Sequence, residues 1–216
     1  MAEFTFIQKI AIYAIPIIFA ITVHEAAHGI VASYFGDQTA RLSGRLTLNP
    51  IKHIDPIGTV VLPLIMLAFG GIIFGWAKPV PVDWRNLRKP KQDMAWVAIA
   101  GPGANFIMMV LWVLFAKMTI DFRDVFQGFT EPMLYMAYAG VQINIILMLL
   151  NMLPVPPLDG SRVVSSLLPP RMAQKYNSIE PYGIIIVLGL VILLFMSGIA
   201  GAAIYGLMKY ALSFVM

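Results

Sequence analysis

The sequence contains no cysteine, only three histidines and only 12% charged residues in 216 positions. Without cysteine the chain can form no disulfide, no thiolate metal site and no cysteine nucleophile. The shortage of charge, together with 59% hydrophobic residues and a mean hydropathy of +0.81, excludes a water-soluble domain. A protein of this size cannot bury so much apolar surface in its own core, so the excess must face lipid.

The basic residues are scattered rather than gathered on one face. The net charge of +4 is spread over short loops, with no RNA-binding signature. Basic loops beside membrane segments are the ordinary result of membrane topology. We therefore expect the lipid bilayer as a partner and no nucleic acid.

Long uncharged runs predict an all-α polytopic membrane protein, a bundle of transmembrane helices forming a single domain over residues 1–216. The expected spans cover about residues 4–35, 94–116, 133–153 and 182–208. The last run can also be read as two short helices around Ser197-Gly198, and one span is favoured. In the second span, Ala100-Gly101-Pro102-Gly103 supplies small residues that permit close helix approach.

Two other segments have less regular patterns. Residues 57–76 are apolar but interrupted by glycine and proline, so they either span or form a re-entrant segment. Residues 39–56 alternate apolar and polar positions, which predicts a short strand or small β-hairpin.

Three ionisable side chains lie close together at the end of the first apolar run: His24, Glu25 and His28. Residues four apart share a helix face, so the two histidines can offer their imidazoles to one metal ion. In such an H-E-x-x-H pattern the histidines bind zinc and the glutamate is the general base. A chance match in a soluble helix can be an ordinary histidine pair. Inside a membrane segment ionisable residues are costly, which favours a functional role.

Catalytic zinc normally has three protein ligands, so two histidines leave one ligand to be found. The candidates are His53 and the acidic residues, among which Asp159 follows directly after the third expected span. The stretch around Asp159 is also typical of a helix stop, because prolines break helices and Asp-Gly forms turns. The residues alone leave both alternatives open.

The order of these motifs resembles a known family. His24-Glu25-x-x-His28, then Ala-Gly-Pro in a later span, then Asn-x-x-Pro-x-x-Pro-x-Asp-Gly ending at Gly160 is similar to the site-2 protease family of intramembrane zinc metalloproteases. The resemblance covers about residues 10–165 and is to a short form without a PDZ or C-terminal regulatory domain. It implies one zinc ion per chain, bound by His24, His28 and Asp159, with Glu25 as the catalytic base.

The resemblance also implies an activity and a location. The protein would be a zinc metalloendopeptidase, a multi-pass protein of the cell membrane, whose substrates are transmembrane segments of other proteins. Asn144, Asn105 and His53 are candidates for contacting substrate or supporting the ligands. Asn144 could bond an unwound substrate or oxyanion, or equally another helix. For His53 a loop or supporting position is favoured over direct coordination.

The positive-inside rule gives a test of topology that is independent of the family. If residues 57–76 re-enter, 11 lysines and arginines lie inside and 3 outside, whereas a crossing gives 9 against 5. The re-entrant arrangement is therefore favoured.

Two other functions compete with proteolysis. In a membrane metal transporter the same four residues would form a transit site, but transport favours repeated halves and none is visible. A catalytically inactive binder of membrane helices has no evident use for Glu25.

Overall fold

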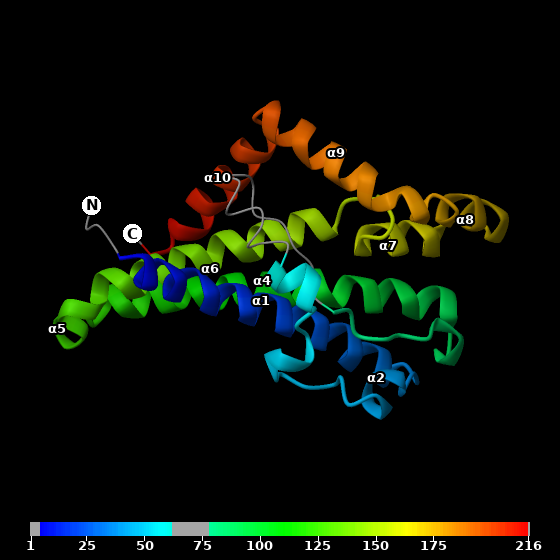
Figure 1. Cartoon of the computed structure of the whole chain (residues 1–216), viewed down its shortest axis with the longest axis horizontal. Helices are drawn as coiled ribbons and strands as arrows, with labels where there is room; N and C mark the ends of the chain where they lie inside the picture. The colour runs from blue at the N-terminus through cyan, green and yellow to red at the C-terminus, as the bar shows by residue number, and fades with distance from the viewer. Residues whose placement is uncertain (1–4, 62–77, 216) are drawn as a thin grey trace.

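The computed structural model describes residues 5–61 and 78–215, and these residues form helices with no strand among them. The α-helices are α1 (Phe6–Tyr34), α2 (Thr39–Leu42), α4 (Pro90–Asp121), α5 (Arg123–Phe126), α6 (Thr130–Asn151), α7 (Asp159–Leu167), α8 (Pro170–Asn177), α9 (Gly183–Met196) and α10 (Ile199–Leu212). Between them lie short 3-10 helices at Pro50–Lys52, Trp84–Asn86, Gln127–Phe129 and Glu180–Tyr182 and a π-helix at Pro56–Val61. The all-α prediction is confirmed (Figure 1).

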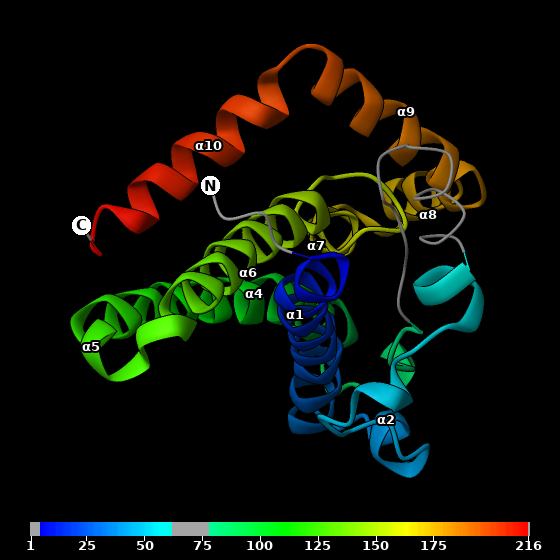
Figure 2. The same cartoon turned by 60° about the vertical axis from the view of Figure 1, so that its left-hand side comes forward.

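The centre of the molecule is a layer of three long helices, α1, α4 and α6 (Figures 1 and 2). α1 and α4 are antiparallel, because His24 contacts Asn105 while His28, further along α1, contacts the earlier Val97. α6 in turn runs against α4 and therefore along α1. Close packing of α4 and α6 needs Gly140, where a Cβ would lie 2.3 Å from the Trp112 ring.

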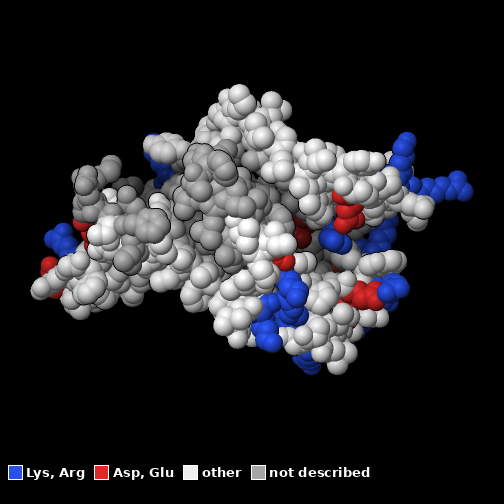
Figure 3. Space-filling model, in the orientation of Figure 1, with Lys and Arg blue, Asp and Glu red and all other residues white. Residues whose placement is uncertain are grey.

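Within residues 5–61 and 78–215, four helical stretches are long and apolar enough to cross a membrane: Ile10–Tyr34, Pro90–Asp121, Arg123–Asn151 and Pro170–Met196. On the face shown in Figure 3, a few charged side chains lie at the left end, most others lie over the lower and right-hand parts, and the described surface between these groups is largely uncharged. An apolar belt between charged ends is what a bilayer requires. The chain is therefore an integral membrane protein.

The β-hairpin expected over residues 39–56 is wrong, because this segment folds into α2 and a 3-10 turn at Pro50–Lys52. Local side chains favour turns here over a strand ladder. Buried Asp37 accepts hydrogen bonds from Thr39, from the Asp83 N–H at 2.8 Å and from the Asn86 amide at 3.2 Å. These four donors, two of them in Thr39, tie the end of α1 to the segment before α4.

The span or re-entrant segment expected over residues 57–76 lies largely outside the described residues. The flank that follows it runs beside the second half of α1, where the Val80 N–H donates to Glu25. The Lys78 N–H donates to the His53 carbonyl oxygen at 2.9 Å, and the Arg88 N–H donates to that of Phe35 at 3.0 Å. The segments before and after this connection therefore meet on one side of the bundle.

The C-terminal segment differs from the single span favoured over residues 182–208. It forms two helices, α9 and α10, that meet at a sharp bend (Figures 1 and 2). Gly198 at the bend has φ +75°, a left-handed conformation that glycine adopts without a side-chain clash. α10 then returns to α6, where Ala211 packs against Val141 and Ile145.

Candidate metal centre

α1 presents His24 and His28 on one face, one helical turn apart. Their Nε2 atoms lie 3.1 Å from each other, and the two rings are nearly perpendicular at 83°. Residues four apart in a helix meet in this way without help from the rest of the fold.

Asp159, the first residue of α7, brings a carboxylate to the same point. Its Oδ2 atom lies 3.2 Å from Nε2 of His24 and 3.4 Å from Nε2 of His28. α7 reaches this position by folding back against the end of α6. Gly160 permits the approach, because a Cβ there would lie 2.3 Å from the Met152 carbonyl oxygen. In the described part of the chain, these three residues form the one cluster that could hold a metal ion.

Hydrogen bonds on the far side of both rings fix their tautomers. Nδ1 of His24 lies 2.6 Å from Oδ1 of Asn105, and Nδ1 of His28 lies 2.7 Å from the Val97 carbonyl oxygen. Both oxygens only accept, so each Nδ1 carries the hydrogen and Nε2 of the neutral ring keeps a free lone pair. Oδ2 of Asp159 is buried with no hydrogen-bond partner among the described residues.

The Nε2 atoms of both histidines and Oδ2 of Asp159 therefore point their lone pairs at one another, and no hydrogen atom lies between them. Such an arrangement favours a cation bound between the three atoms. Donor atoms bound tetrahedrally to one zinc ion at about 2.0–2.1 Å lie about 3.3 Å apart. The observed separations of 3.1, 3.2 and 3.4 Å match that spacing. Two imidazoles and one carboxylate are also a donor set found in catalytic zinc sites, so the residues fit zinc.

Asn105 connects this cluster to the middle of the bundle. Its amide nitrogen donates to Oδ1 of Asn144 at 2.9 Å and to the Ala20 carbonyl oxygen at 3.3 Å. Asn144 donates in turn to the Gly140 carbonyl oxygen at 2.8 Å, and both asparagines are fully buried. Asn105 thus orients the His24 ring directly. Asn144 makes an interhelical bond and does not line the cavity at the cluster.

Glu25 faces the same cavity as the cluster. The cavity has a volume of about 240 Å³, and its lining also includes Val82, Asn151 and Arg162. Oε2 of Glu25 accepts a hydrogen bond of 2.8 Å from the Val80 N–H. The extended stretch before α4 therefore holds this carboxylate beside the three converging donors.

His53 lies outside this cavity. It is buried in the loop after Pro50–Lys52, where Nε2 donates to the Thr47 carbonyl oxygen at 2.9 Å. This is the loop position that the sequence favoured over direct coordination.

Two features of the site were not assigned to it from the sequence. Gly101 was interpreted only as a residue for close helix packing, yet a Cβ there would lie 2.4 Å from Nε2 of His28 and 2.6 Å from Nε2 of His24. The Val80 N–H was missed entirely, since a backbone donor leaves no signal in residue type. The prolines on either side of Val80 are the nearest hint, because they predict extended backbone.

Two histidines, an aspartate and a glutamate therefore come together where α1 meets α7 and the stretch before α4, and their side chains are of the kinds found in metal-dependent hydrolases. The sequence profile of peptidase family M50 matches residues 123–196, which include Asp159. The chain is 42% identical over 175 residues to "Putative zinc metalloprotease YwhC" of Bacillus subtilis, covering 81% of this chain and 77% of that relative.

More distant relatives have the same kind of name. "Putative zinc metalloprotease Rip2" of Mycolicibacterium smegmatis is 29% identical over 178 residues, covering 80% of this chain and 63% of the relative. The protein of the same name in Mycobacterium tuberculosis is 25% identical over 173 residues, covering 78% of this chain and 62% of that relative. No solved structure matches.

The chain belongs to peptidase family M50, the site-2 protease family of zinc metalloproteases. The resemblance drawn from the motifs is thereby confirmed. The chain spans about three quarters of the Bacillus relative and less than two thirds of the two mycobacterial relatives.

Proposed function

We propose that the chain is an intramembrane zinc metalloendopeptidase of the cell membrane, which hydrolyses peptide bonds within or near transmembrane segments of other proteins. The observation that supports this most is the group of three donor atoms 3.1–3.4 Å apart, with Glu25 in the same cavity. Three of the helices that line this cavity, α1, α4 and α6, are long and apolar enough to cross a membrane.

In this proposal one zinc ion per chain is held by His24, His28 and Asp159. When bound there, zinc would lower the pKa of a coordinated water towards about 7 and polarise the scissile carbonyl group. The oxygen atoms of Asn105 and Val97 keep both rings turned so that their Nε2 lone pairs face the ion.

Glu25 is the proposed general base. It would take a proton from the attacking water as the water oxygen bonds to the carbonyl carbon, and would donate it to the amide nitrogen as the C–N bond breaks. The Val80 N–H orients Oε2, while Oε1 makes no hydrogen bond within the described part of the chain.

The proposed substrate follows from the depth of the site. His24 lies ten residues before the end of α1, about 15 Å of helix rise, so the cut falls inside the bilayer rather than at its surface. A substrate helix must unwind there, because its carbonyl groups are otherwise hydrogen-bonded and shielded. Asn151 and Arg162 in the lining give water a polar route from the nearer end of the bundle.

The test is cleavage of a labelled transmembrane peptide by the zinc-loaded full chain in liposomes. Glu25→Gln should lower the cleavage rate about 10²–10⁴-fold while zinc content stays at the wild-type value. Glu131→Gln, which changes an exposed carboxylate in the first turn of α6, should cleave like wild type.

Three results would contradict the proposal. One is a zinc-loaded wild type that cleaves no transmembrane peptide but still binds one, which would favour a helix binder. Another is zinc flux into liposomes without cleavage, which would favour a transporter. The third is a Glu25→Gln variant as active as wild type, which would remove Glu25 from the chemistry.

A further inference from the structure

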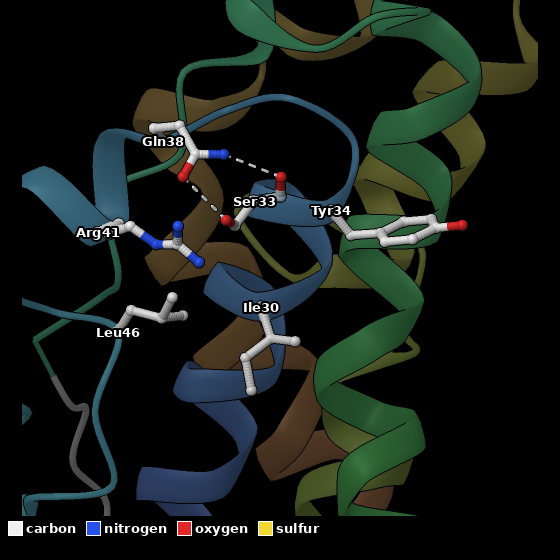
Figure 4. Close-up of a pocket in the computed structure, with 6 residues that line it drawn as sticks. All are labelled: Ile30, Ser33, Tyr34, Gln38, Arg41 and Leu46. Atoms are coloured by element: carbon white, nitrogen blue, oxygen red, sulfur yellow. Dashed lines mark hydrogen bonds between the residues drawn. The ribbon is translucent and has the colours of Figure 1, made fainter.

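A second hollow lies at the end of α1, apart from the metal centre. Its volume is about 450 Å³, and it lies between the last turns of α1, α2 and the chain just after α2. Figure 4 shows its six lining residues, Ile30, Ser33, Tyr34, Gln38, Arg41 and Leu46. The lining of the metal cavity contains none of these six.

The polar rim of this hollow is fixed, and its one charged group is unpaired. Ser33 Oγ donates to Gln38 Oε1 at 3.1 Å, and Gln38 Nε2 donates back to the Ser33 carbonyl oxygen at 3.0 Å. The Arg41 guanidinium points over the last turns of α1 (Figure 4) and has no ion-pair partner among the described residues. Asp37, the acid nearest in sequence, is buried and already accepts from four donors.

The hollow lies at the level of a bilayer interface. Tyr34 closes the membrane-spanning stretch of α1 with 73% of its surface exposed, and exposed tyrosine is typical of the head-group level. Leu42, the last residue of α2, and Ile51, in the 3-10 turn Pro50–Lys52, are 86% and 73% exposed. In water such exposure is unfavourable, whereas beside a bilayer these side chains contact acyl chains.

The charge on this end selects the kind of lipid. Two further basic residues, Arg45 and Lys52, follow Arg41 in the segment after α2, and the Arg45 guanidinium donates to the Lys52 carbonyl oxygen. Guanidinium groups bind phosphate through paired hydrogen bonds, and basic clusters at this level attract anionic lipids.

We propose that this hollow binds an anionic phospholipid. The phosphate pairs with Arg41 at the rim, and an acyl chain runs along the apolar wall made by Ile30 and Leu46. The apolar wall on the lipid side of α1 favours a lipid over a free anion, because a soluble phosphate would leave that wall uncovered.

The experiment is native mass spectrometry of the full chain after equilibration with mixed phosphatidylglycerol and phosphatidylcholine. Wild type should retain phosphatidylglycerol preferentially, and Arg41→Gln should lower that retention about tenfold, the effect of losing a charge-assisted contact. Arg171→Gln changes an exposed arginine of α8 that has no ion-pair partner in the described part of the chain, and it should behave like wild type.

The proposal is overturned if Arg41→Gln retains the lipid like wild type, or if both variants lose it equally, which would mean general surface charge. It is also overturned if inorganic phosphate displaces the lipid at matched concentration. If Arg41→Gln does not fold, a photoreactive residue at position 34 in the otherwise unchanged chain decides the matter. Preferential crosslinking to phosphatidylglycerol supports the site, and equal crosslinking to both lipids contradicts it.

Discussion

The contact between Gly101 and the two histidines gives the sharpest prediction. In Gly101→Ala the new Cβ would lie 2.4 Å from Nε2 of His28, whereas real Cβ contacts essentially never fall below 3.0 Å. The atoms must therefore separate by at least 0.6 Å, the difference between those two distances. Metal sites tolerate deviations of only about 0.2 Å in ligand distances. We expect zinc affinity to fall at least tenfold, about 1.4 kcal/mol.

The matched control is Gly103→Ala, two residues further along α4, where a Cβ meets no atom within 4 Å. Both changes replace a helical glycine by alanine, which by itself favours the helix, so their difference isolates the contact with the imidazoles. Zinc affinity is measured by titration against a competing chelator, and folding by circular dichroism. Equal zinc affinity in both variants would refute the proposed role of Gly101.

Three further changes test the surroundings of the site. Asn105→Leu removes the hydrogen-bond acceptor for Nδ1 of His24. We expect zinc affinity to fall about 10–100-fold with helix content unchanged. An unchanged zinc affinity would mean that the His24 ring does not need this hydrogen bond. Gly160→Ala should lower zinc content by moving the start of α7, whereas Gly189→Ala, where a Cβ meets nothing within 4 Å, should not; equal zinc content would contradict this. Burial of Asp37 opposes its ionisation, but the hydrogen bonds that it accepts outweigh burial and hold its pKa below the ordinary value. The ionised carboxylate therefore stabilises the fold at neutral pH, and this stabilisation is lost as the pH falls below about 4. Thermal unfolding should therefore show Asp37→Asn destabilised by about 1–3 kcal/mol at pH 7 with the difference shrinking in acid, and a difference independent of pH would contradict this.

The parts of the site that depend on local geometry could be predicted from the sequence. Helix periodicity alone places His24 and His28 together. Asp159 lies 131 residues beyond His28, and only the fold-back of α7 at Gly160 brings it to the same point. The residues around Asp159 are equally typical of a helix stop, so without the family the choice stayed open.

The errors in the predicted fold have identifiable causes. The alternation over residues 39–56 is short, and the hydrogen bonds to Asp37 and Asn49 close turns that no strand pattern can reveal. In the C-terminal segment, Gly198 lies inside a continuous apolar run, and glycine is common within straight membrane helices. The left-handed conformation that makes it a bend is set by the return of α10 to α6.

The most direct test of the central claim is the zinc content per chain of the detergent-purified protein, measured for wild type and for Asp159→Asn. We expect close to one zinc ion per wild-type chain and a large loss in the variant, since the third ligand is weakened while His24 and His28 remain. No zinc in the wild type, or full zinc in Asp159→Asn, would contradict a site built from these three residues.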